Sequence, residues 1–276
     1  MKKSHFTFTL IHRLKSDPIL DWAATLAYYF MLSIFPLIIF ILALIPYFQI
    51  DIEGLQHFIE DFVPNELADI LFTTIFEVVS EPQGGLLSFG ILATVWSASN
   101  GINALIRAVN RSYTVEETRG FLRLRFLSIG LTISMIIVIV IALLLPVFGD
   151  LIITTLDRFF LLPAETTAVL KMLRWIIGIT LMSLILMIVY RLAPNMKLTF
   201  SQVLIGAFVA TIGWQLISIA FSTYISHFGQ FSATYGSLGG VIVLMLWFFL
   251  TGLILVIGGQ VNAVLYHLHK EKSYKK

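Results

Sequence analysis

Four polar residues recur at helical spacing in a stretch of the chain that is otherwise mostly apolar. Asn100, Asn103, Arg107 and Asn110 are separated by three, four and three positions, so in an α-helix they lie on one face. Amide and guanidinium groups arranged in such a row can hydrogen-bond to water, carbonyl groups or anions. Two interpretations remain open, because the row either lines a hydrated cavity or joins neighbouring helices through hydrogen bonds.

Composition places these residues in a membrane protein. Of 276 residues, 58% are hydrophobic and only 12% are charged, whereas about 25% are charged in a typical soluble domain. Six segments have the roughly 20 largely apolar residues that a transmembrane helix needs, and none alternates as a barrel strand does. We therefore predict an all-α integral membrane protein with one domain, 1–276, and spans at 22–48, 86–106, 126–148, 173–192, 203–225 and 238–265.

Other apolar segments also carry polar side chains. Because such groups are costly inside a bilayer, we expect the second, fifth and sixth spans to form a polar interior. The third span is almost entirely Ile, Leu and Val, and we expect it to face lipid. The residues predicted to line the cavity or its mouth are Asn100, Asn103, Arg107, Asn110, Arg111, Arg191, Gln215, Ser218, Gln260 and Asn262.

The positions of Lys and Arg predict the orientation. If the N-terminus is cytoplasmic, fifteen of these residues lie inside and only Arg158, Lys171 and Arg174 lie outside. Cytoplasmic loops carry the excess of basic residues in membrane proteins. We therefore expect both termini to be inside.

The connection between the first two spans is acidic. Residues 51–81 contain eight Asp or Glu and no Lys or Arg, with apolar residues at helical spacing. This pattern predicts short amphipathic helices on the outer surface of the membrane. They either cap the helix bundle or present an acidic surface that attracts cations or docks a partner.

The first span contains a proline. Pro36 removes one helical hydrogen bond, and with Ser33 it predicts a kink, or a hinge of the kind found in the broken helices of transporters. Asp21 begins the same helix. There its charge either caps the helix N-terminus or pairs with Arg107 or Arg191.

The sequence contains none of the common catalytic motifs. The absence of cysteine excludes disulfides, thiol catalysis and thiolate metal sites. No Asp or Glu lies at the centre of a span, and no phosphate-binding loop, nucleophile elbow or zinc-binding helix is present. We therefore expect no metal, no cofactor, no nucleic-acid partner and no enzymatic activity.

Several short sequences occur together in a characteristic order. They are the stretches 23–29, 33–36, 96–101, 107–111, 190–195, 206–207 and 235–239, followed by 259–263. Together they resemble the YihY/BrkB family of bacterial inner-membrane proteins over residues 20–265. One departure is Gln260, where an acidic residue is common in the family, so an ionic role at this position is in doubt.

The resemblance implies a six-helix protein of the bacterial cytoplasmic membrane with a poorly defined activity. Some members carry an older name, ribonuclease BN. Phosphodiester cleavage usually requires clustered carboxylates with metal ions, or a His pair, and this sequence offers neither.

Our leading hypothesis is a transporter or lipid-handling protein with a polar cavity open to the cytoplasm. Its expected partners are membrane lipids, with anionic lipids favoured by the basic loops, and a second copy of the chain or an envelope protein is an alternative partner. The competing hypothesis is a structural or interaction protein of the cell envelope. A ribonuclease is a remote third.

Overall fold

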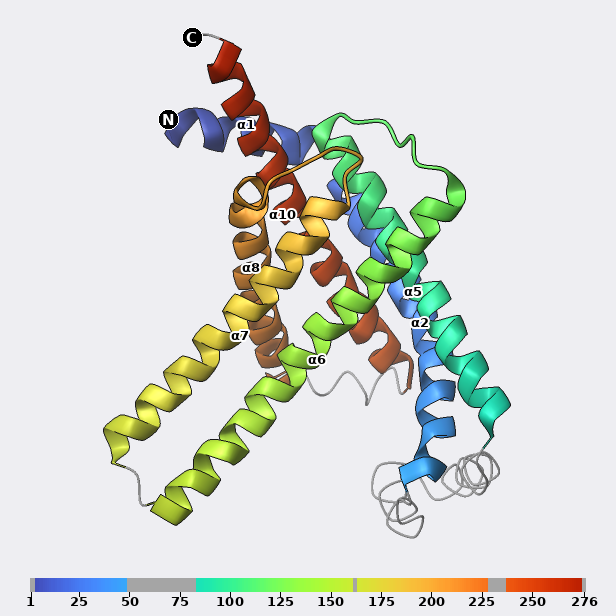
Figure 1. Ribbon diagram of the computed structural model, residues 1–276, viewed down its shortest axis with the longest axis vertical. Coiled ribbons are helices and arrows are strands. Elements are labelled where there is room, and N and C mark those ends of the chain that lie inside the picture. Colours follow the sequence, from blue (N-terminus) through green and yellow to red (C-terminus); the bar gives the residue numbers. More distant parts are fainter. Residues whose placement is uncertain (1–2, 49–82, 161–162, 228–236, 275–276) are drawn as a thin grey trace. The chain divides into compact units, whose positions relative to one another are not determined.

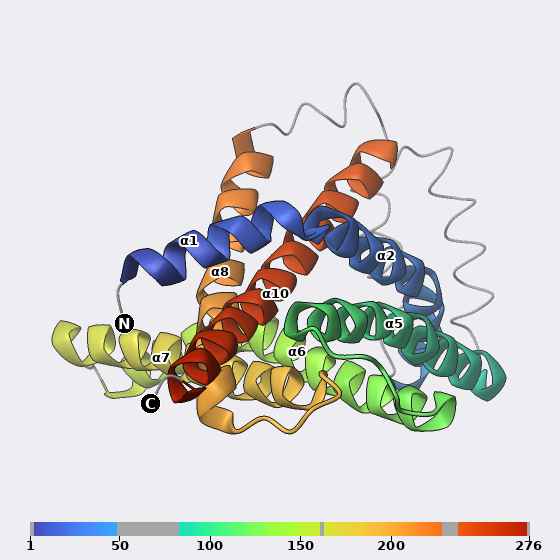
Figure 2. The same cartoon turned by 90° about the horizontal axis from the view of Figure 1, so that it is seen from above.

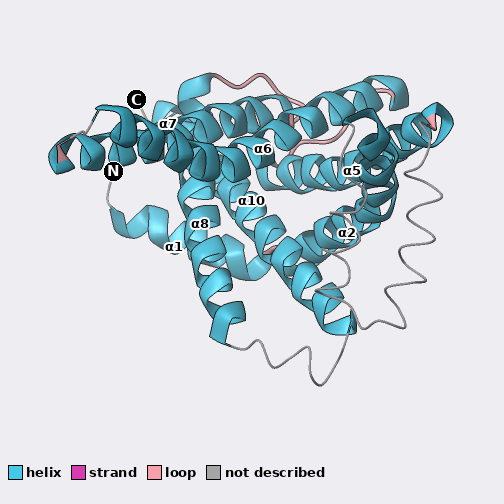
Figure 3. Ribbon diagram, turned by 90° about the horizontal axis from the view of Figure 1, so that it is seen from below, coloured by secondary structure: helices cyan, strands magenta, loops and turns pink. Residues whose placement is uncertain are grey.

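The computed structural model describes residues 3–48, 83–160, 163–227 and 237–274. This part of the chain forms seven α-helices and one 3₁₀ turn, without a strand (Figures 1 and 3), which confirms the predicted all-α fold. The elements are α1 (Lys3–Ser16), α2 (Ile19–Leu44), η1 (Ile45–Phe48), α5 (Gly84–Tyr113), α6 (Phe121–Phe160), α7 (Ala164–Leu192), α8 (Phe200–His227) and α10 (Ser237–Tyr274).

Six of these helices contain a stretch long and apolar enough to cross a membrane, as predicted. The six stretches are Ile19–Leu44, Gly84–Tyr113, Phe121–Ile141, Glu165–Leu192, Phe200–Tyr224 and Gly239–Lys270. The helices α5 and α6 extend further than the predicted spans, because polar and charged residues end an apolar run without ending a helix. The predicted amphipathic helices at 51–81 lie outside the described residues.

The helix α1 was not predicted. Its residues Lys3–Ser16 mix basic and hydroxyl side chains with apolar ones, so they lack the apolar run that indicates a span. In the structure α1 packs against α10 (Figures 1 and 2). Arg13 also joins it to α5, because Nη1 of Arg13 donates a hydrogen bond of 2.6 Å to the carbonyl oxygen of Ser112.

The chain divides into two compact units, which are described separately. The smaller unit is Tyr29–Ala98. In it α2 and α5 approach closely at Gly90, where an added Cβ would lie 2.8 Å from the backbone of Phe40. The larger unit comprises Met1–Tyr28 and Ser99–Lys276.

In the larger unit, α7, α8 and α10 meet where small residues allow close approach. The backbone N–H of Gly206 in α8 donates a 2.7 Å hydrogen bond to Oδ1 of Asn262 in α10. The hydroxyl of Tyr190 in α7 donates a 2.7 Å bond to the carbonyl oxygen of Leu255 in α10. Small residues at helix contacts and polar bonds between helices are the usual means of association in membranes.

Neither glycine at this crossing has room for a side chain. A Cβ at Gly206 would collide with the carbonyl oxygen of Gly258 and with the side chain of Asn262. A Cβ at Gly258 would collide with the hydroxyl of Tyr190 and lie 2.8 Å from Cβ of Ala210. The absence of side chains at both positions is therefore a steric requirement of the crossing.

We predict that Gly206→Ala and Gly258→Ala each destabilise the protein, by about 1–3 kcal/mol, which is the usual cost of overpacking. The matched control is Gly130→Ala in α6, where a Cβ meets nothing within 4 Å. Since Ala favours a helix over Gly by about 1 kcal/mol, the control should be neutral or stabilising. Thermal unfolding of the purified proteins in detergent measures all three, and equal melting temperatures would contradict the steric argument.

Candidate functional site

The C-terminal half of α5 is buried on every side but one. Between Ser99 and Tyr113, the residues that are not buried are Asn100, Asn103, Arg107 and Arg111. Their spacing of three, four and four places them on one face of the helix. We term these four residues the α5 polar stripe. It runs for about 16 Å along the helix, compared with about 30 Å for the hydrocarbon core of a bilayer.

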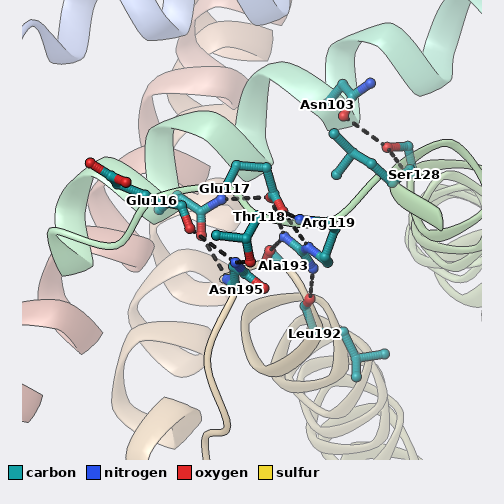
Figure 4. Close-up of polar contacts among 11 residues, drawn as sticks. Asn103, Glu116, Glu117, Thr118, Arg119, Ser128, Leu192, Ala193 and Asn195 are labelled. Carbon is teal, nitrogen blue, oxygen red and sulfur yellow. Dashed lines mark hydrogen bonds and ion pairs between the residues drawn. The ribbon is translucent and has the colours of Figure 1, made fainter. Parts of the chain in front are cut away.

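Two polar residues of α6 bind Asn100 and Asn103 of the stripe. Nη1 of Arg125 donates a 2.8 Å hydrogen bond to Oδ1 of Asn100. The hydroxyl of Ser128 donates a 3.0 Å bond to Oδ1 of Asn103 (Figure 4). The stripe is therefore polar on both sides at this point, with α5 supplying amides and α6 supplying a guanidinium and a hydroxyl.

The expectation that the third span faces lipid is wrong for the first turns of α6. Arg125, Ser128 and Thr132 are buried, with 8%, 0% and 2% of their surface exposed. They are spaced by three and four residues and so share one helical face. The many Ile, Leu and Val residues of this segment dominate its average and conceal that polar row.

The other two residues of the stripe, Arg107 and Arg111, carry positive charge without an acidic partner among the described residues. Arg107 and Arg111 are exposed, and neither guanidinium forms a hydrogen bond or ion pair with another residue that the structure describes. A guanidinium offers five N–H donors in a planar fork that matches carboxylates and phosphates. The stripe is thus suited to holding an anionic group.

Asn110 lies at the edge of this row but is buried, because two loops cover it. Its Nδ2 donates a 2.9 Å hydrogen bond to Oε2 of Glu117, and its Oδ1 accepts a 2.7 Å bond from the backbone N–H of Asn195. Nδ2 of Asn195 in turn donates to the carbonyl oxygen of Glu116 and to the hydroxyl of Thr118 (Figure 4). Asn110 therefore joins the loop after α5 to the loop after α7.

Arg119 completes this connection at the end of α7. Its guanidinium donates to the carbonyl oxygens of Leu192 and Ala193, at 3.2 and 2.7 Å (Figure 4). These carbonyls have no partner within the helix. Nε of Arg119 also donates a 2.7 Å bond to Oε1 of Glu117. The bonds from Arg119 hold the pKa of the Glu117 carboxyl below its usual range.

The contacts of Glu117, Arg119 and Asn195 were not predicted from the sequence. All three lie in loops, where helical periodicity gives no information. Thr114, which begins the first loop, has a left-handed backbone with φ of 58°. A β-branched residue rarely adopts this conformation, and nothing in the sequence marks it. Only the pairing of the two loops in space brings these residues together.

The other candidate residues are distributed over several contacts. Nε of Arg191 donates a 3.0 Å bond to the carbonyl oxygen of Leu198, and the guanidinium lies 4.2 Å from the ring centroid of Phe200. Nε2 of Gln215 is 3.9 Å from Sδ of Met182. Arg191 and Gln215 thus lie in contacts separate from the α5 polar stripe.

The candidates in α10 bind different helices. Nε2 of Gln260 donates a 2.6 Å bond to Oδ2 of Asp17, between α1 and α2. Asn262 binds Gly206, and Ser218 lines a pocket between α8 and α10. The ten candidates therefore do not meet in one chamber, and four of them form the stripe.

Asp21 and Pro36 both lie within α2. Asp21 is exposed in the first turn of the helix, where a negative charge interacts favourably with the helix dipole. Pro36 lies inside α2, which continues as an α-helix to Leu44. The hydroxyl of Ser33 donates a 2.6 Å bond to the carbonyl oxygen of Phe30.

Comparison with known proteins decides the family. Residues 10–276 match the family model described as "Virulence factor BrkB". The chain belongs to the BrkB family. The ribonuclease-like protein YfkH of Bacillus subtilis (strain 168) is 43% identical over 251 residues, which cover 91% of this chain and 90% of YfkH.

More distant BrkB-family relatives are named only as membrane proteins. A "UPF0761 membrane protein" of Tolumonas auensis is 25% identical over 96% of this chain and 86% of its own length. A second, from Vibrio vulnificus (strain YJ016), is 27% identical over 94% and 82%. No solved structure matches the chain. The protein is thus a BrkB-family membrane protein, and its described part contains six apolar helices long enough to cross a membrane.

We predict that Glu117→Gln lowers stability at neutral pH by about 1.5–3 kcal/mol, the usual contribution of a hydrogen bond to a charged group. The folded state lowers the pKa of Glu117, so its contribution is complete above the unfolded value of about 4.3. The contribution is lost as the pH falls through the folded value.

Melting temperatures from pH 7 to pH 3 test this difference. Wild type and Glu117→Gln should differ at pH 7 and converge at the acid end. Glu116→Gln is the matched control, because Glu116 is exposed and only its backbone carbonyl takes part in the loop contact. A constant gap between wild type and Glu117→Gln would show that the charge on Glu117 is irrelevant.

Proposed function

We propose that this BrkB-family protein binds an anionic, lipid-like molecule and moves it along the α5 polar stripe. The observation that carries the proposal is the exposure of Arg107 and Arg111 on the C-terminal half of α5, whose other faces are buried. The proposal treats the stripe, and not the wider set of candidate residues, as the path of the substrate.

Energetics supports a polar occupant for the stripe. Arg107 and Arg111 follow the apolar run of the second predicted span, which ends at residue 106. Because charged side chains are costly in hydrocarbon, hydrocarbon is a poor neighbour for this end of the stripe. Water, a lipid headgroup or an anionic substrate satisfies the guanidinium groups instead. Arginine binds phosphate through two parallel hydrogen bonds, which favours a phosphate-bearing headgroup with its apolar tails left in the bilayer.

We infer that the protein lies in the cytoplasmic membrane with both termini inside. The excess of Lys and Arg on that side supports this orientation. The loops 114–120 and 193–199 are then cytoplasmic, and Arg111 lies near the inner headgroups. Anionic lipids there contribute about 1 kcal/mol for each basic side chain, which concentrates the proposed substrate at the start of the stripe.

A ribonuclease activity has less support. YfkH is named ribonuclease-like, and phosphodiester cleavage usually relies on carboxylates that hold metal ions, or on a His pair. Within the described ranges, no three His, Asp or Glu side chains come together as a metal site. An interaction role for residues 51–81 concerns a segment outside the described part of the chain.

The orientation can be tested with single cysteines, since the natural chain has none. Glu116→Cys lies in the loop before α6, and Glu165→Cys lies in the first turn of α7. We expect a membrane-impermeant maleimide to label Glu165→Cys in spheroplasts and to label Glu116→Cys only after the membrane is opened. The reverse pattern would overturn the inferred orientation.

Transport can be tested in proteoliposomes that contain phosphatidylglycerol with a fluorescent headgroup. We expect wild-type protein to accelerate bleaching of the inner leaflet by external dithionite. Arg107→Ala and Asn100→Leu should each slow this movement about tenfold, which corresponds to about 1.4 kcal/mol. Arg123→Ala is the matched control, because it removes an exposed arginine from α6 and not from the stripe.

Two results would refute the proposal outright, and a third would remove the role of the stripe. One is a wild-type rate equal to that of protein-free liposomes for this probe. The other is an equal rate in wild type, Arg107→Ala and Asn100→Leu. A loss of rate in Arg123→Ala as large as that in Arg107→Ala would assign the effect to general surface charge, and the stripe would lose its role.

A further inference from the structure

A second site lies between α8 and α10, away from the α5 polar stripe. The two helices touch at Gly206 and Gly258 and again where Gly213 meets Ile254. Beyond these contacts the two helices separate, toward the end of α8 at His227 and the start of α10 at Ser237 (Figures 1 and 3). The space between them is an open pocket of about 480 Å³, lined by Ser218, Phe221, Ser222, Gly240, Val243, Leu244 and Trp247.

The pocket is mainly apolar and has an aromatic wall. The ring of Trp247 lies edge-on to that of Trp214, with centroids 6.1 Å apart, and 5.4 Å from the ring centroid of Phe248. Aromatic pairs of this kind hold side chains in place. The wall is therefore a preformed surface for an apolar group.

Two hydroxyl groups interrupt the apolar lining on one side. Ser218 and Ser222 are one turn apart on α8. Oγ of Ser218 is buried and has no hydrogen-bond partner among the described residues. Since buried polar groups normally have partners, this hydroxyl is available to a polar atom of a molecule in the pocket.

The surface around the pocket is also apolar. Leu216 and Ile219 on α8, and Val241 and Met245 on α10, are between 45% and 63% exposed. On helices that cross a membrane, such side chains face lipid. Since the pocket is open and lies on helices with exposed apolar side chains, hydrocarbon is the occupant that a bilayer supplies.

We propose that the pocket binds an acyl chain of a membrane phospholipid, with an ester oxygen accepting a hydrogen bond from Ser218. Ser218 and Ser222 lie nine and five residues before the end of α8 at His227, so both hydroxyls are in the half of α8 that leads to this end. The chain then runs from the serines toward Leu244 and Trp247.

The pocket differs from the stripe in what it recognises. The stripe offers guanidinium groups to an anionic headgroup, whereas the pocket offers an apolar wall and hydroxyls to an ester-linked tail. Binding in the pocket therefore does not require a negative charge. A zwitterionic phospholipid isolates this site from the proposed transport function.

Gly240 allows a direct test, because a Cβ at this position meets nothing within 4 Å. Gly240→Phe places an aromatic ring in the lining of the pocket, on a Cβ that has room. Gly130→Phe is the matched control, since Gly130 is equally unobstructed but lies on α6. The probe is phosphatidylcholine with a photoreactive diazirine in the middle of one chain, incorporated with the full-length protein into nanodiscs.

We expect the photoadducts of wild type, mapped by mass spectrometry, to concentrate on residues 214–224 and 240–248. Gly240→Phe should lower this yield at least threefold, while Gly130→Phe and Arg107→Ala leave it unchanged. Quenching of tryptophan fluorescence by brominated phosphatidylcholine should fall in Gly240→Phe as well. The melting temperature of each variant establishes that it is folded, and Gly240→Leu replaces Gly240→Phe if the larger side chain prevents folding.

Three results would overturn the proposal. Adducts spread evenly over all lipid-facing helices would mean that the pocket has no preference for lipid. An unchanged yield in both folded Gly240 variants would place the adducts elsewhere. Cross-links between two protein chains at these residues, without lipid adducts, would identify a second copy of the chain as the occupant.

Discussion

The fold of this protein depends on the cost of leaving a polar group without a partner in hydrocarbon. In the larger unit this cost is met by bonds between particular helices. Asn262 binds the backbone of Gly206, Tyr190 binds the carbonyl of Leu255, and the hydroxyls of Ser183 and Thr211 bind each other at 3.1 Å. Each bond fixes the rotation of one helix relative to another, which apolar contacts alone do not do. Arg107 and Arg111 of the α5 polar stripe differ, since their guanidinium groups have no such partners among the described residues.

The transmembrane helices were predictable because long apolar runs report directly on burial in lipid. The helix α1 was not predictable in this way, because it has no long apolar run. The full length of α5 was not predictable either, because polar residues continue the helix beyond its apolar run. The face shared by Asn100, Asn103 and Arg107 followed from periodicity. The contacts of this face with Arg125 and Ser128 could not be predicted, since periodicity gives the face of a helix but not the helix that it contacts. Asn110 illustrates the same limit, because the loop that buries it begins more than 80 residues later.

The two sites of the larger unit differ in chemistry in a way that suits the two parts of a phospholipid. One end of the unit carries arginines, amides and a network of polar loops (Figure 4). The pocket between α8 and α10 is lined by aromatic and aliphatic side chains with two serines. In the two proposals, the stripe recognises the charge of the headgroup and the pocket recognises the acyl chain, so the two can be tested separately. The family name refers to virulence and YfkH to ribonuclease, and neither word describes the chemistry of these surfaces.

The glycine contacts of α8 and α10 also limit how the protein can change shape. Turning α10 about its axis would move Asn262 away from α8 and break its bond to Gly206, and in one direction it would bring Ile257 in place of Gly258. Sliding it by one turn would bring Leu255 or Ile254 against a backbone that accommodates no side chain. Because the hydroxyl of Tyr190 binds the carbonyl oxygen of Leu255, a shift of α10 along α7 would break that hydrogen bond as well.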